Sequence, residues 1–288
     1  MSGSVGQGSA ALAPADSARQ NGDMTEFAPP LENPAQPVLQ RHTPYDPAAL
    51  KPLPGIAPMH PDEWLLVDEA FAAQMALRDG LLAQRSNDVV AMLPAAAAAA
   101  DELLARVLEY LSGQPAYRVA DHQVIRPDGA EVAIDRARPM QCLTRLVQED
   151  LCIMEKPVGQ SEHILSAASL CFPAAWLLAE KIGRPMLHIH HTVPDYDPNT
   201  AKRVQRLLDG VQPGRPLWRF NGHAHVDPRL FNPQSIHDKR PYPEQETERW
   251  WRTERQTLTR LPDSGAVVFS IHTYMLDRRA MTGPLALD

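Results

Sequence analysis

Three histidines lie within four positions of one largely apolar stretch, residues 186–194. They are His188, His190 and His191, and the stretch ends at a proline. We predict a strand here, in which His188 and His190 would share one face because side chains alternate along a strand. Two imidazoles on a buried face are unfavourable unless they bind a ligand or form hydrogen bonds. The stretch is therefore the first candidate site.

A second histidine pair, His223 and His225, lies in a predicted strand over residues 217–226. Alternation would place Arg219 and Asn221 on the face of these histidines. Arg219 could neutralise a carboxylate or a propionate, or it could form half of a structural ion pair. Two His-x-His strands that face each other could bind iron, copper, nickel or zinc. The alternative is that most of the 11 histidines are surface residues or hydrogen-bonded core residues.

Charged residues elsewhere give weaker candidate sites. Glu149 and Asp150 form an acidic pair at the end of a predicted amphipathic helix, residues 143–151. This pair could carry acid–base chemistry, or it could be a solvated helix face or a helix cap. A predicted helix over residues 246–261 has charges that we interpret as a solvated surface, namely Arg252, Glu254 and Arg255. The sequence contains no glycine-rich nucleotide-binding motif and no GxSxG motif.

The composition is typical of a globular protein that acts on small molecules or a protein partner. Of 288 residues, 44% are hydrophobic and 22% are charged, and the net charge is −7. The interspersed charges argue against a nucleic-acid-binding surface. No apolar run reaches the roughly 18 residues of a membrane helix, and residues 1–21 do not resemble a secretory signal. Three widely spaced cysteines, Cys142, Cys152 and Cys171, are expected to be reduced thiols of a cytoplasmic protein.

The beginning of the chain is expected to form neither helices nor strands. Residues 1–40 are rich in Gly, Ser, Ala and Pro, and we predict a disordered tail. Prolines recur through residues 41–60, which indicates an extended arm. A single folded domain is expected over residues 61–281, followed by a short tail, residues 282–288.

Helices lead in this predicted domain, and strands alternate with helices later. The predicted helices are residues 62–82, 94–111, 143–151, 172–183, 199–208 and 246–261. The predicted strands are a hairpin over 123–134, then 163–172, 186–194, 217–226 and 266–275, the last of which contains His272. This order predicts an α+β fold with an N-terminal helical portion and a mixed or antiparallel sheet.

Several motifs occur along the chain in an order that resembles a known family. They are Leu146-Val-Gln-Glu-Asp-Leu151, Phe172-Pro-Ala-Ala-Trp176, Glu180-Lys-Ile-Gly183, Ile189-His-His-Thr-Val-Pro194, Arg219-Phe-Asn221, Arg252-Thr-Glu-Arg-Gln-Thr-Leu258, Leu261-Pro262 and Phe269-Ser-Ile-His-Thr-Tyr274. From about residue 45 to residue 281, the chain resembles the haem-binding alpha subunit of the haem-dependent oxidative N-demethylases. That family was formerly known only as a domain of unknown function.

The resemblance implies a PAS-like fold, a mostly antiparallel sheet flanked by helices, which holds haem b non-covalently. It implies oxidative removal of a methyl group from a small secondary alkylamine such as dimethylamine, with O2 consumed and formaldehyde released. In such systems a separate reductase with NADPH, flavin and an iron–sulfur centre supplies electrons, and a folate-binding partner captures the formaldehyde. The sequence has no dinucleotide motif and no iron–sulfur cysteine set, which fits a subunit that receives electrons.

A haem site needs an axial ligand, apolar walls and basic groups beside the propionates. In this interpretation His190 is the axial ligand and His188 is its neighbour. The other candidate residues around the cofactor are Trp176, Val193, Trp218, Phe220, Arg219, Asn221 and Arg255. Glu149 or Asp150 would hold the cationic amine or relay protons, with Tyr274 as a second polar contact.

One departure from the family bears on the substrate more than on the haem. Thr192 stands where the family pattern Ile-His-x-Pro-Val-Pro has its first proline, and His191 fills the variable position. Two rival interpretations stay open. One is a non-catalytic haem or small-ligand sensor with a PAS-like fold, although the sequence shows no output domain. The other is a non-haem metalloenzyme built on the His-x-His strands.

Overall fold

A seven-stranded sheet forms the centre of the part of the chain that the computed structural model describes, residues 1, 36–190, 197–238 and 247–287. Its strand order is β1-β8-β9-β10-β6-β7-β2, and every neighbouring pair is antiparallel. The strands are β1 (Ala57–Pro58), β2 (Val90–Met92), β6 (Asp150–Glu155), β7 (Ile164–Ser169), β8 (Leu217–His225), β9 (Trp250–Arg260) and β10 (Val267–Asp277). The predicted α+β class with a mostly antiparallel sheet is confirmed, and the PAS-like description stays a prediction.

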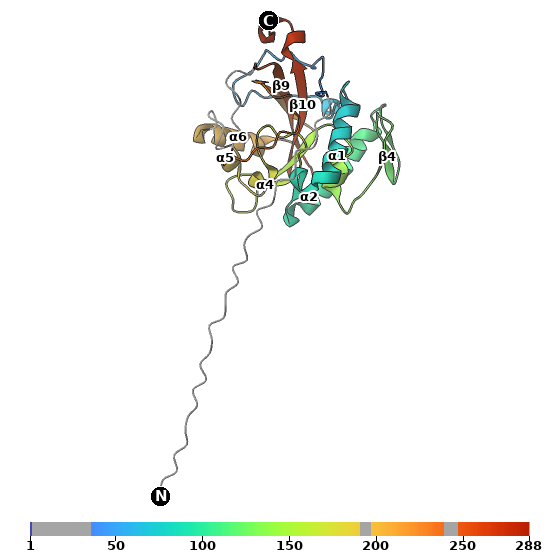
Figure 1. The fold of residues 1–288 in the computed structure, drawn as a ribbon. Helices are drawn as coiled ribbons and strands as arrows, with labels where there is room; N and C mark the ends of the chain where they lie inside the picture. Colours follow the sequence, from blue (N-terminus) through green and yellow to red (C-terminus); the bar gives the residue numbers. More distant parts are fainter. Residues whose placement is uncertain (2–35, 191–196, 239–246, 288) are drawn as a thin grey trace. The chain divides into compact units, whose positions relative to one another are not determined.

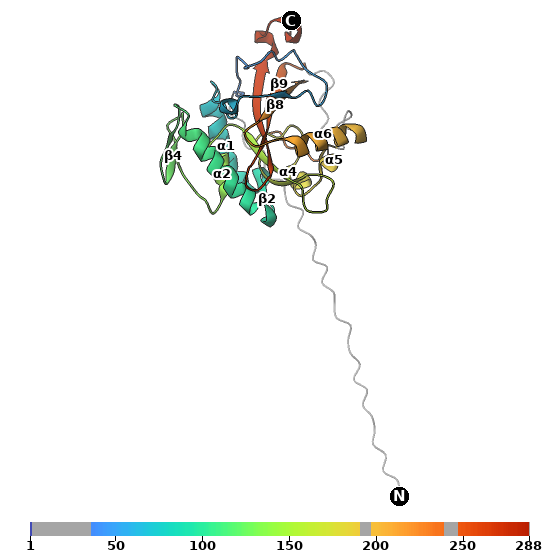
Figure 2. The same ribbon diagram turned by 180° about the vertical axis from the view of Figure 1, so that it is seen from behind.

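Helices cover both sides of this sheet (Figures 1 and 2). One side carries α1 (Phe71–Val89), α2 (Ala97–Ser112) and α3 (Pro139–Thr144), and the other carries α4 (Leu178–Lys181), α5 (Met186–Ile189) and α6 (Pro198–Gly210). A small sheet of β3 (Arg118–Val119), β4 (Gln123–Ile125) and β5 (Glu131–Ala133) packs with the first group. The buried apolar side chains accordingly form two clusters, one for each group of helices.

The register of β8, β9 and β10 determines which side chains project toward α4, α5 and α6. Asn221 lies opposite Glu254, and Glu254 lies opposite Thr273, with no register shift along either pair of strands. Directly opposite residues of antiparallel strands project to the same side of the sheet. Leu258 and Phe269, which share this side, pack with side chains of α4, α5 and α6. Polar residues an even number of positions from Leu258 on β9, or from Phe269 on β10, therefore face the same helices.

Several elements lie where the sequence predicts them. The alanine run forms α2 after a 3-10 turn, η2 (Pro94–Ala96), and the helix ends before Gly113. The hairpin is β4–β5, with Gly129 at φ 83° in its turn. The predicted elements over 163–172, 199–208, 217–226 and 266–275 are β7, α6, β8 and β10. Local propensity and turn chemistry agree with the tertiary contacts at these places.

The helix predicted over residues 246–261 is wrong, because this segment contains the strand β9. Its charges suggested a solvated surface, yet β9 pairs with strands on both sides and nearly all of its side chains are buried or half-buried. Its arginines donate to backbone carbonyls of distant segments: Arg252 to Leu230 and Arg255 to Trp64. Such partners come together only in the folded chain.

The helix predicted over residues 143–151 is also wrong. The helix α3 ends at Thr144, and the strand β6 begins at Asp150. Leu146, Val147 and Leu151 are all buried. Apolar spacing does not separate a helix from a strand in a segment that is covered on every side.

Two predicted helices are shorter in the structure. The first begins at Phe71 rather than near Asp62, after a 3-10 turn, η1 (Pro61–Glu63). In the segment between this turn and α1, a side chain accepts a hydrogen bond from the backbone: Leu66 N–H donates to Glu149 Oε1 at 2.8 Å. The helix predicted over 172–183 is reduced to α4, which ends before Gly183 at φ 74°.

The strand predicted over residues 186–194 is wrong in its described part. Met186–Ile189 form the one-turn helix α5, and His190 N–H donates to Met186 O at 3.2 Å. A short apolar run is compatible with both a helical turn and a strand, so it does not distinguish them. His191 and Thr192 lie outside the described residues.

The ends of the chain bear on the predicted tails. Most of the predicted tail over residues 1–40 lies outside the described residues, but Gln40 at its end is buried, and its N–H donates to Met275 O at 3.0 Å. After β10 follow two 3-10 turns, η3 (Arg278–Ala280) and η4 (Gly283–Leu285). In the described part of the chain, no helix combines the length and apolar character needed to cross a membrane.

Candidate functional site

A polar sheet face lies on the side of β8, β9 and β10 that packs toward α4, α5 and α6. We use this name for Arg219, Asn221, His223, Arg252, Glu254, Gln256 and Thr273, which the strand register places on one side. The prediction that Arg219, Asn221, His223 and His225 share a strand face is confirmed. Most of these side chains are only half-buried on β8, whereas those on β9 are mostly buried.

Hydrogen bonds connect the side chains of the polar sheet face. Arg219 Nη1 donates to Gln256 Oε1 at 2.8 Å, and Gln256 Nε2 donates to Glu254 Oε2 at 3.1 Å. Asn221 Nδ2 donates to the same Glu254 oxygen at 3.0 Å, and Asn221 Oδ1 accepts from Glu254 N–H at 3.1 Å. Two amide side chains therefore fix the orientation of the Glu254 carboxylate.

Two buried polar atoms of this face have no hydrogen-bond partner among the described residues, Arg219 Nε and Thr273 Oγ1. Burial lowers the pKa of Arg219, and the charge of Glu254 acts in the opposite direction. A buried polar atom without a partner destabilises a protein by about 1–3 kcal/mol. A polar ligand that bonded to these atoms would recover that free energy.

His190 follows α5 directly and has the chemistry of a metal ligand. Its Nδ1 lies 3.0 Å from Met186 O, which can only accept, so the ring proton is on Nδ1 and the lone pair is on Nε2. Desolvation lowers the pKa of His190 to about 4, so the ring is neutral at pH 7. Histidines that bind metals commonly donate their other N–H to a backbone carbonyl in this way.

Trp176 packs against the same apolar cluster as Ile189, the residue before His190. Lys181 Nζ is 4.2 Å from the centre of the Trp176 ring, and desolvation lowers the pKa of Lys181 to about 8. Besides desolvation, the positive charge of Lys181 lowers the pKa of His190, whereas the hydrogen bond to the Met186 backbone raises it. Burial raises the pKa of Cys152, on which the charges of both Lys181 and Glu254 also act. Ile189, next to His190, packs in one apolar cluster with Leu258 of β9 and Ile271 of β10, so His190 follows a residue on the side of the sheet that carries the polar sheet face.

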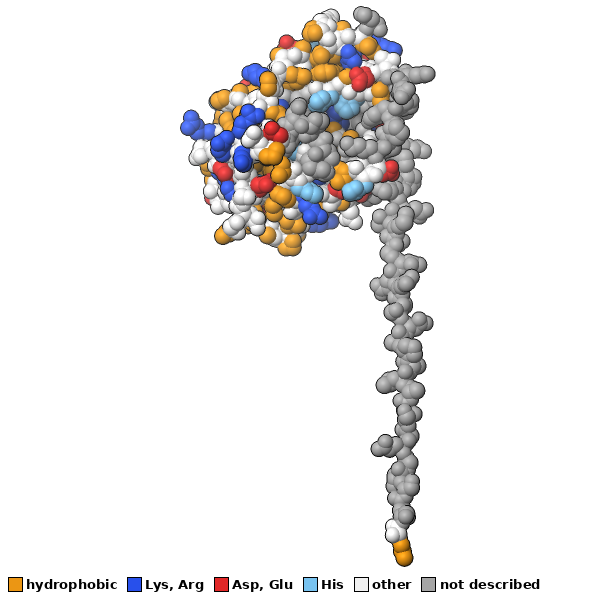
Figure 3. Space-filling view, turned by 90° about the vertical axis from the view of Figure 1, so that its left-hand side faces the viewer, with side chains coloured by type: hydrophobic (Ala, Val, Ile, Leu, Met, Phe, Trp, Pro, Cys, Tyr) orange, Lys and Arg blue, Asp and Glu red, His pale blue; other side chains and the backbone are white. Residues whose placement is uncertain are grey.

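His188 lies within α5 and is exposed. Because α5 is a helix, His188 and His190 do not share a strand face, and that part of the prediction is wrong. Figure 3 views the molecule from the side of α5 and α6, where several histidine side chains lie at the surface.

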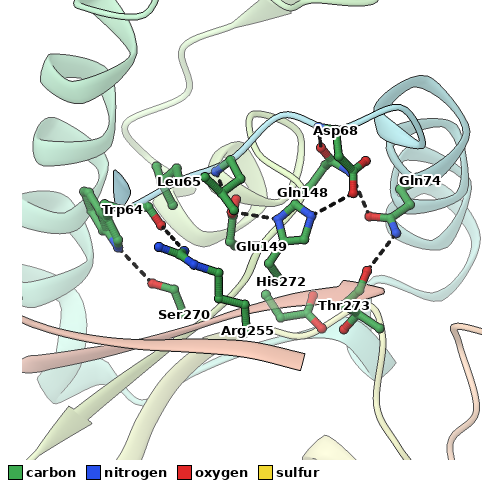
Figure 4. Close-up of polar contacts among 12 residues, drawn as sticks. Trp64, Leu65, Asp68, Gln74, Gln148, Glu149, Arg255, Ser270, His272 and Thr273 are labelled. Atoms are coloured by element: carbon green, nitrogen blue, oxygen red, sulfur yellow. Dashed lines mark hydrogen bonds and ion pairs between the residues drawn. The ribbon is translucent and has the colours of Figure 1, made fainter. Parts of the chain in front are cut away.

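The opposite side of β10 carries a buried carboxylate–imidazole–carboxylate triad (Figure 4). His272 Nδ1 lies 2.9 Å from Glu149 Oε1, and His272 Nε2 lies 3.1 Å from Asp68 Oδ2. Gln148 Nε2 donates to Asp68 Oδ1 at 2.8 Å. Glu149 Oε2 has no partner among the described residues.

The triad contains an imidazolium. Both ring nitrogens of His272 face carboxylate oxygens, which only accept when they are ionised, so both nitrogens must donate. Desolvation disfavours this charge, but Glu149 and Asp68 outweigh it and raise the pKa of His272 to about 9. Desolvation also opposes ionisation of Asp68, yet its contacts with His272 and two glutamines lower its pKa to about 2.

Asp150, at the start of β6, belongs to a second buried network, which it forms with Arg78 of α1. Arg78 Nη1 donates to Asp150 Oδ1 at 2.6 Å, and both side chains are buried. The backbone N–H groups of Cys171 and Phe172 donate to the same carboxylate at 2.7 and 2.9 Å. This geometry favours a structural role for Asp150, and the predicted catalytic role remains a prediction.

Arg255 and Tyr274 lie on the side of the triad. Arg255 donates to the backbone oxygens of Trp64 and Glu63 at 3.3 and 2.5 Å, and the Tyr274 ring centre is 4.7 Å from that of His272. The central sheet therefore separates the predicted site residues into two sets. His190, Trp176, Arg219 and Asn221 are on the side of α4–α6, and Glu149, Tyr274 and Arg255 are on the side of α1.

A family model described as haem-dependent oxidative N-demethylase, alpha subunit-like, matches residues 55–283. The chain belongs to this family. The match includes all seven strands of the central sheet and both sets of candidate residues. The resemblance that the sequence motifs indicate is thereby confirmed, and membership supports a haem-dependent oxidoreductase and further subunits.

The residues around His190 fit the haem on which the N-demethylase family depends. His190 supplies a neutral imidazole, and Arg219 supplies a buried guanidinium whose Nε has no partner among the described residues. Apolar side chains of Ile189, Phe269 and Ile271 belong to the cluster on this side. Haem requires these three kinds of group, a ligand, an anion partner and apolar walls.

A metal site built on two His-x-His strands is not formed in the described residues. His223 and His225 lie on β8, whereas His188 and His190 lie on or just after a helix. No group of three or more His, Cys, Asp or Glu side chains that could hold a metal ion occurs within the described ranges.

Sequence reasoning assigned no site role to Glu254 or Asp68. A signal for Glu254 is present, because Arg252, Glu254 and Gln256 alternate with a period of two, as on a strand. Asp68 has no comparable signal, since only folding brings it beside His272, 204 positions away.

Proposed function

We propose that this chain is the haem-binding subunit of an oxidative N-demethylase that acts on a small secondary alkylamine such as dimethylamine. The observation that carries the proposal is His190, a half-buried neutral imidazole on the side of the sheet that carries the polar sheet face, in a chain that belongs to the N-demethylase family. The reaction breaks one carbon–nitrogen bond and releases the methyl carbon as formaldehyde. It takes up one O2, two protons and two electrons from a partner, the other two electrons coming from the amine, and yields the demethylated amine, formaldehyde and one water.

Haem b, when bound, supplies the activation of O2. His190 Nε2 would hold its iron, while His190 Nδ1–H donates to Met186 O. Arg219 is the proposed partner of a propionate, because its Nε has no bond among the described residues and a guanidinium binds carboxylates through parallel hydrogen bonds. Arg255 was expected to share this role, but its guanidinium donates to backbone oxygens on the other side of the sheet.

Other residues near His190 would enclose the cofactor and exclude water. Trp176, beneath Lys181, is a proposed wall of the pocket. The backbone before it is unusual, because Ala175 has a φ of 58°, a left-handed conformation that non-glycine residues rarely adopt. Ala175 N–H donates to Asn232 O at 3.0 Å, which holds this turn in place. Asn221 is proposed to support the site by orienting Glu254.

The proposed partners follow from what the chemistry requires. The three cysteines are buried, free and separate, which does not suit an iron–sulfur cluster. We therefore propose that electrons come from a separate subunit with NADPH, flavin and an iron–sulfur centre, in the cytoplasm, and that a folate-binding subunit receives the formaldehyde.

The absorption spectrum of the protein after haem supplementation tests the cofactor. We expect an intense Soret band, its loss in His190→Ala, and its retention in His188→Ala, which removes an exposed imidazole from the preceding helix α5. A wild-type protein without a Soret band refutes the proposal, and full haem occupancy in His190→Ala refutes the ligand. Formaldehyde release from dimethylamine with a reducing partner separates an enzyme from a sensor.

A further inference from the structure

We propose that Glu254 and Thr273 form an acceptor pair that binds the two N–H groups of a dialkylammonium ion. This inference rests on the proposed function and adds to it the residues that select a secondary amine. It follows from the strand register, the hydrogen bonds of Glu254 and an unpaired hydroxyl on the neighbouring strand.

The two residues are neighbours on the polar sheet face. Glu254 of β9 lies directly opposite Thr273 of β10. Directly opposite residues of antiparallel strands have Cβ atoms about 4.5–5.5 Å apart and point to the same side. The carboxylate and the hydroxyl can therefore contact one small ligand together.

Glu254 retains capacity to accept hydrogen bonds. Its Oε2 accepts from Asn221 and Gln256, whereas among the described residues its Oε1 has one long contact, an ion pair with Arg252 Nε at 3.4 Å. An ionised carboxylate has about four lone-pair sites. The Glu254 side chain is 13% exposed, so a cation that reached Oε1 would be largely shielded from water.

Arg252 does not depend on Glu254 for its hydrogen bonds. Its guanidinium donates to the backbone oxygens of Phe172 and Leu230 at 2.5 and 3.2 Å. The arginine therefore stays in place while Oε1 accepts from a ligand.

The other described carboxylates near this region are already engaged. Asp150 accepts from Arg78 and two backbone N–H groups. Glu180 accepts from the Ser235 hydroxyl and the Ile236 N–H. Glu149 lies on the other side of the sheet with His272. Glu254 is therefore the carboxylate that the geometry assigns to a cation.

Thr273 supplies the second acceptor. Its Oγ1 is buried without a hydrogen-bond partner among the described residues. A dialkylammonium ion carries two N–H donors, a trialkylammonium ion carries one, and a tetraalkylammonium ion carries none. An acceptor pair consequently favours a secondary amine over its more methylated relatives, although all three carry one positive charge.

Binding of methylammonium ions to the haem-loaded protein tests the inference. Wild-type protein should bind dimethylammonium more tightly than trimethylammonium, and trimethylammonium more tightly than tetramethylammonium, as measured by calorimetry and by the shift of the Soret band. The variant Glu254→Gln keeps an oxygen for Asn221 and Gln256 but removes the charge. It should lose roughly 10- to 100-fold in dimethylammonium affinity, as expected for a hydrogen bond to a charged group.

Thr273→Val, which preserves shape, should lose roughly 2- to 10-fold and reduce the preference for dimethylammonium over trimethylammonium. Thr257→Val is the matched control. Thr257 also has a buried Oγ1 without a hydrogen-bond partner in the described part of the chain, but it lies on the opposite side of the sheet. It should bind dimethylammonium as the wild type does. All variants should keep the wild-type haem content.

The outcomes separate this inference from the proposed function. If Glu254→Gln contains haem and binds dimethylammonium with wild-type affinity, the acceptor pair is refuted and the proposed function stands. Equal losses in Thr273→Val and Thr257→Val also refute it, because the effect would not depend on the polar sheet face. A wild-type protein that takes up haem but does not respond to dimethylammonium refutes both.

Discussion

At the scale of single residues, two histidines on opposite sides of the sheet differ in their protonation. On the α1 side, His272 is fixed as an imidazolium between two carboxylates. On the α5 side, His190 is neutral because desolvation outweighs its hydrogen bond to the Met186 backbone oxygen. The same side-chain type is therefore charged in an ion pair at one position and neutral at the other, where we propose that it binds the haem iron. The difference follows from the partners, because His272 lies between two carboxylates, whereas His190 donates to a backbone carbonyl.

The raised pKa of His272 predicts how the free energy of unfolding depends on pH. The pKa of His272 is about 9 in the folded protein and near 6.5 when unfolded. Its contribution to stability is therefore complete below pH 6.5 and is lost as the pH rises through about 9. Urea unfolding between pH 6 and 10 should show this decline in the wild type.

Lys181 provides the control for this measurement. Its pKa of about 8 is below the ordinary value of 10.5, so its contribution to stability rises with pH over that interval. The variant Lys181→Met should therefore retain the decline or steepen it. A proton resonance of His272 that titrates near pH 6.5 in the folded protein would contradict the imidazolium assignment.

At the scale of elements, strand β9 joins the two sides of the sheet. Alternate side chains project toward α4–α6 and toward α1, so one strand contributes Glu254 to the polar sheet face and Arg255 to the packing around Trp64. Its contact with β8 is very close at one position. Trp251 lies against Gly222, where a Cβ atom would be 2.6 Å from Trp251 Cζ2.

We expect Gly222→Ala to destabilise the protein by about 1–3 kcal/mol, because the Trp251 ring must move to admit a methyl group. Gly80→Ala is the matched control: Gly80 lies within α1, with no atom within 4 Å of an added Cβ. That change should stabilise the helix by about 0.5–1 kcal/mol. Equal midpoints of urea unfolding for Gly222→Ala and the wild type would contradict the close contact.

At the scale of the whole molecule, Arg78 connects segments that are distant in the sequence. From α1 it donates to the backbone oxygens of Thr144, Gln148 and Glu149 and to Asp150. It therefore joins the first helix to α3 and to the start of β6. The Asp150 carboxylate in turn holds the backbone that leads from β7 toward Trp176.

Arg78→Ala should lower the free energy of unfolding by about 3–5 kcal/mol, since it leaves the Asp150 carboxylate buried without its ion pair. Arg106→Ala removes an exposed ion pair with Glu109 on α2 and should change stability by about 1 kcal/mol at most. Chemical denaturation of both variants measures the difference. A similar, small effect for both would mean that the Arg78 network contributes little.

The sequence by itself determined the features that depend on local signals and on family motifs. The alanine-rich helix, the Pro-Asp-Gly hairpin, the strands β8 and β10, and the shared face of Arg219 and Asn221 are all local in origin. Strand alternation and turn chemistry act over a few residues, so they can be recognised without the fold. The order of the motifs was sufficient to identify the family.

Only the tertiary structure decided which side of the sheet each candidate residue occupies. Glu149 and Arg255 lie with the triad, and the charged run around Glu254 is a strand rather than a solvated helix. The physical reason is that burial of a charge requires partners, and Asp68, His272 and Glu149 are far apart along the chain. Their protonation states, like the acceptor pair of Glu254 and Thr273, are properties of contacts that exist only after folding.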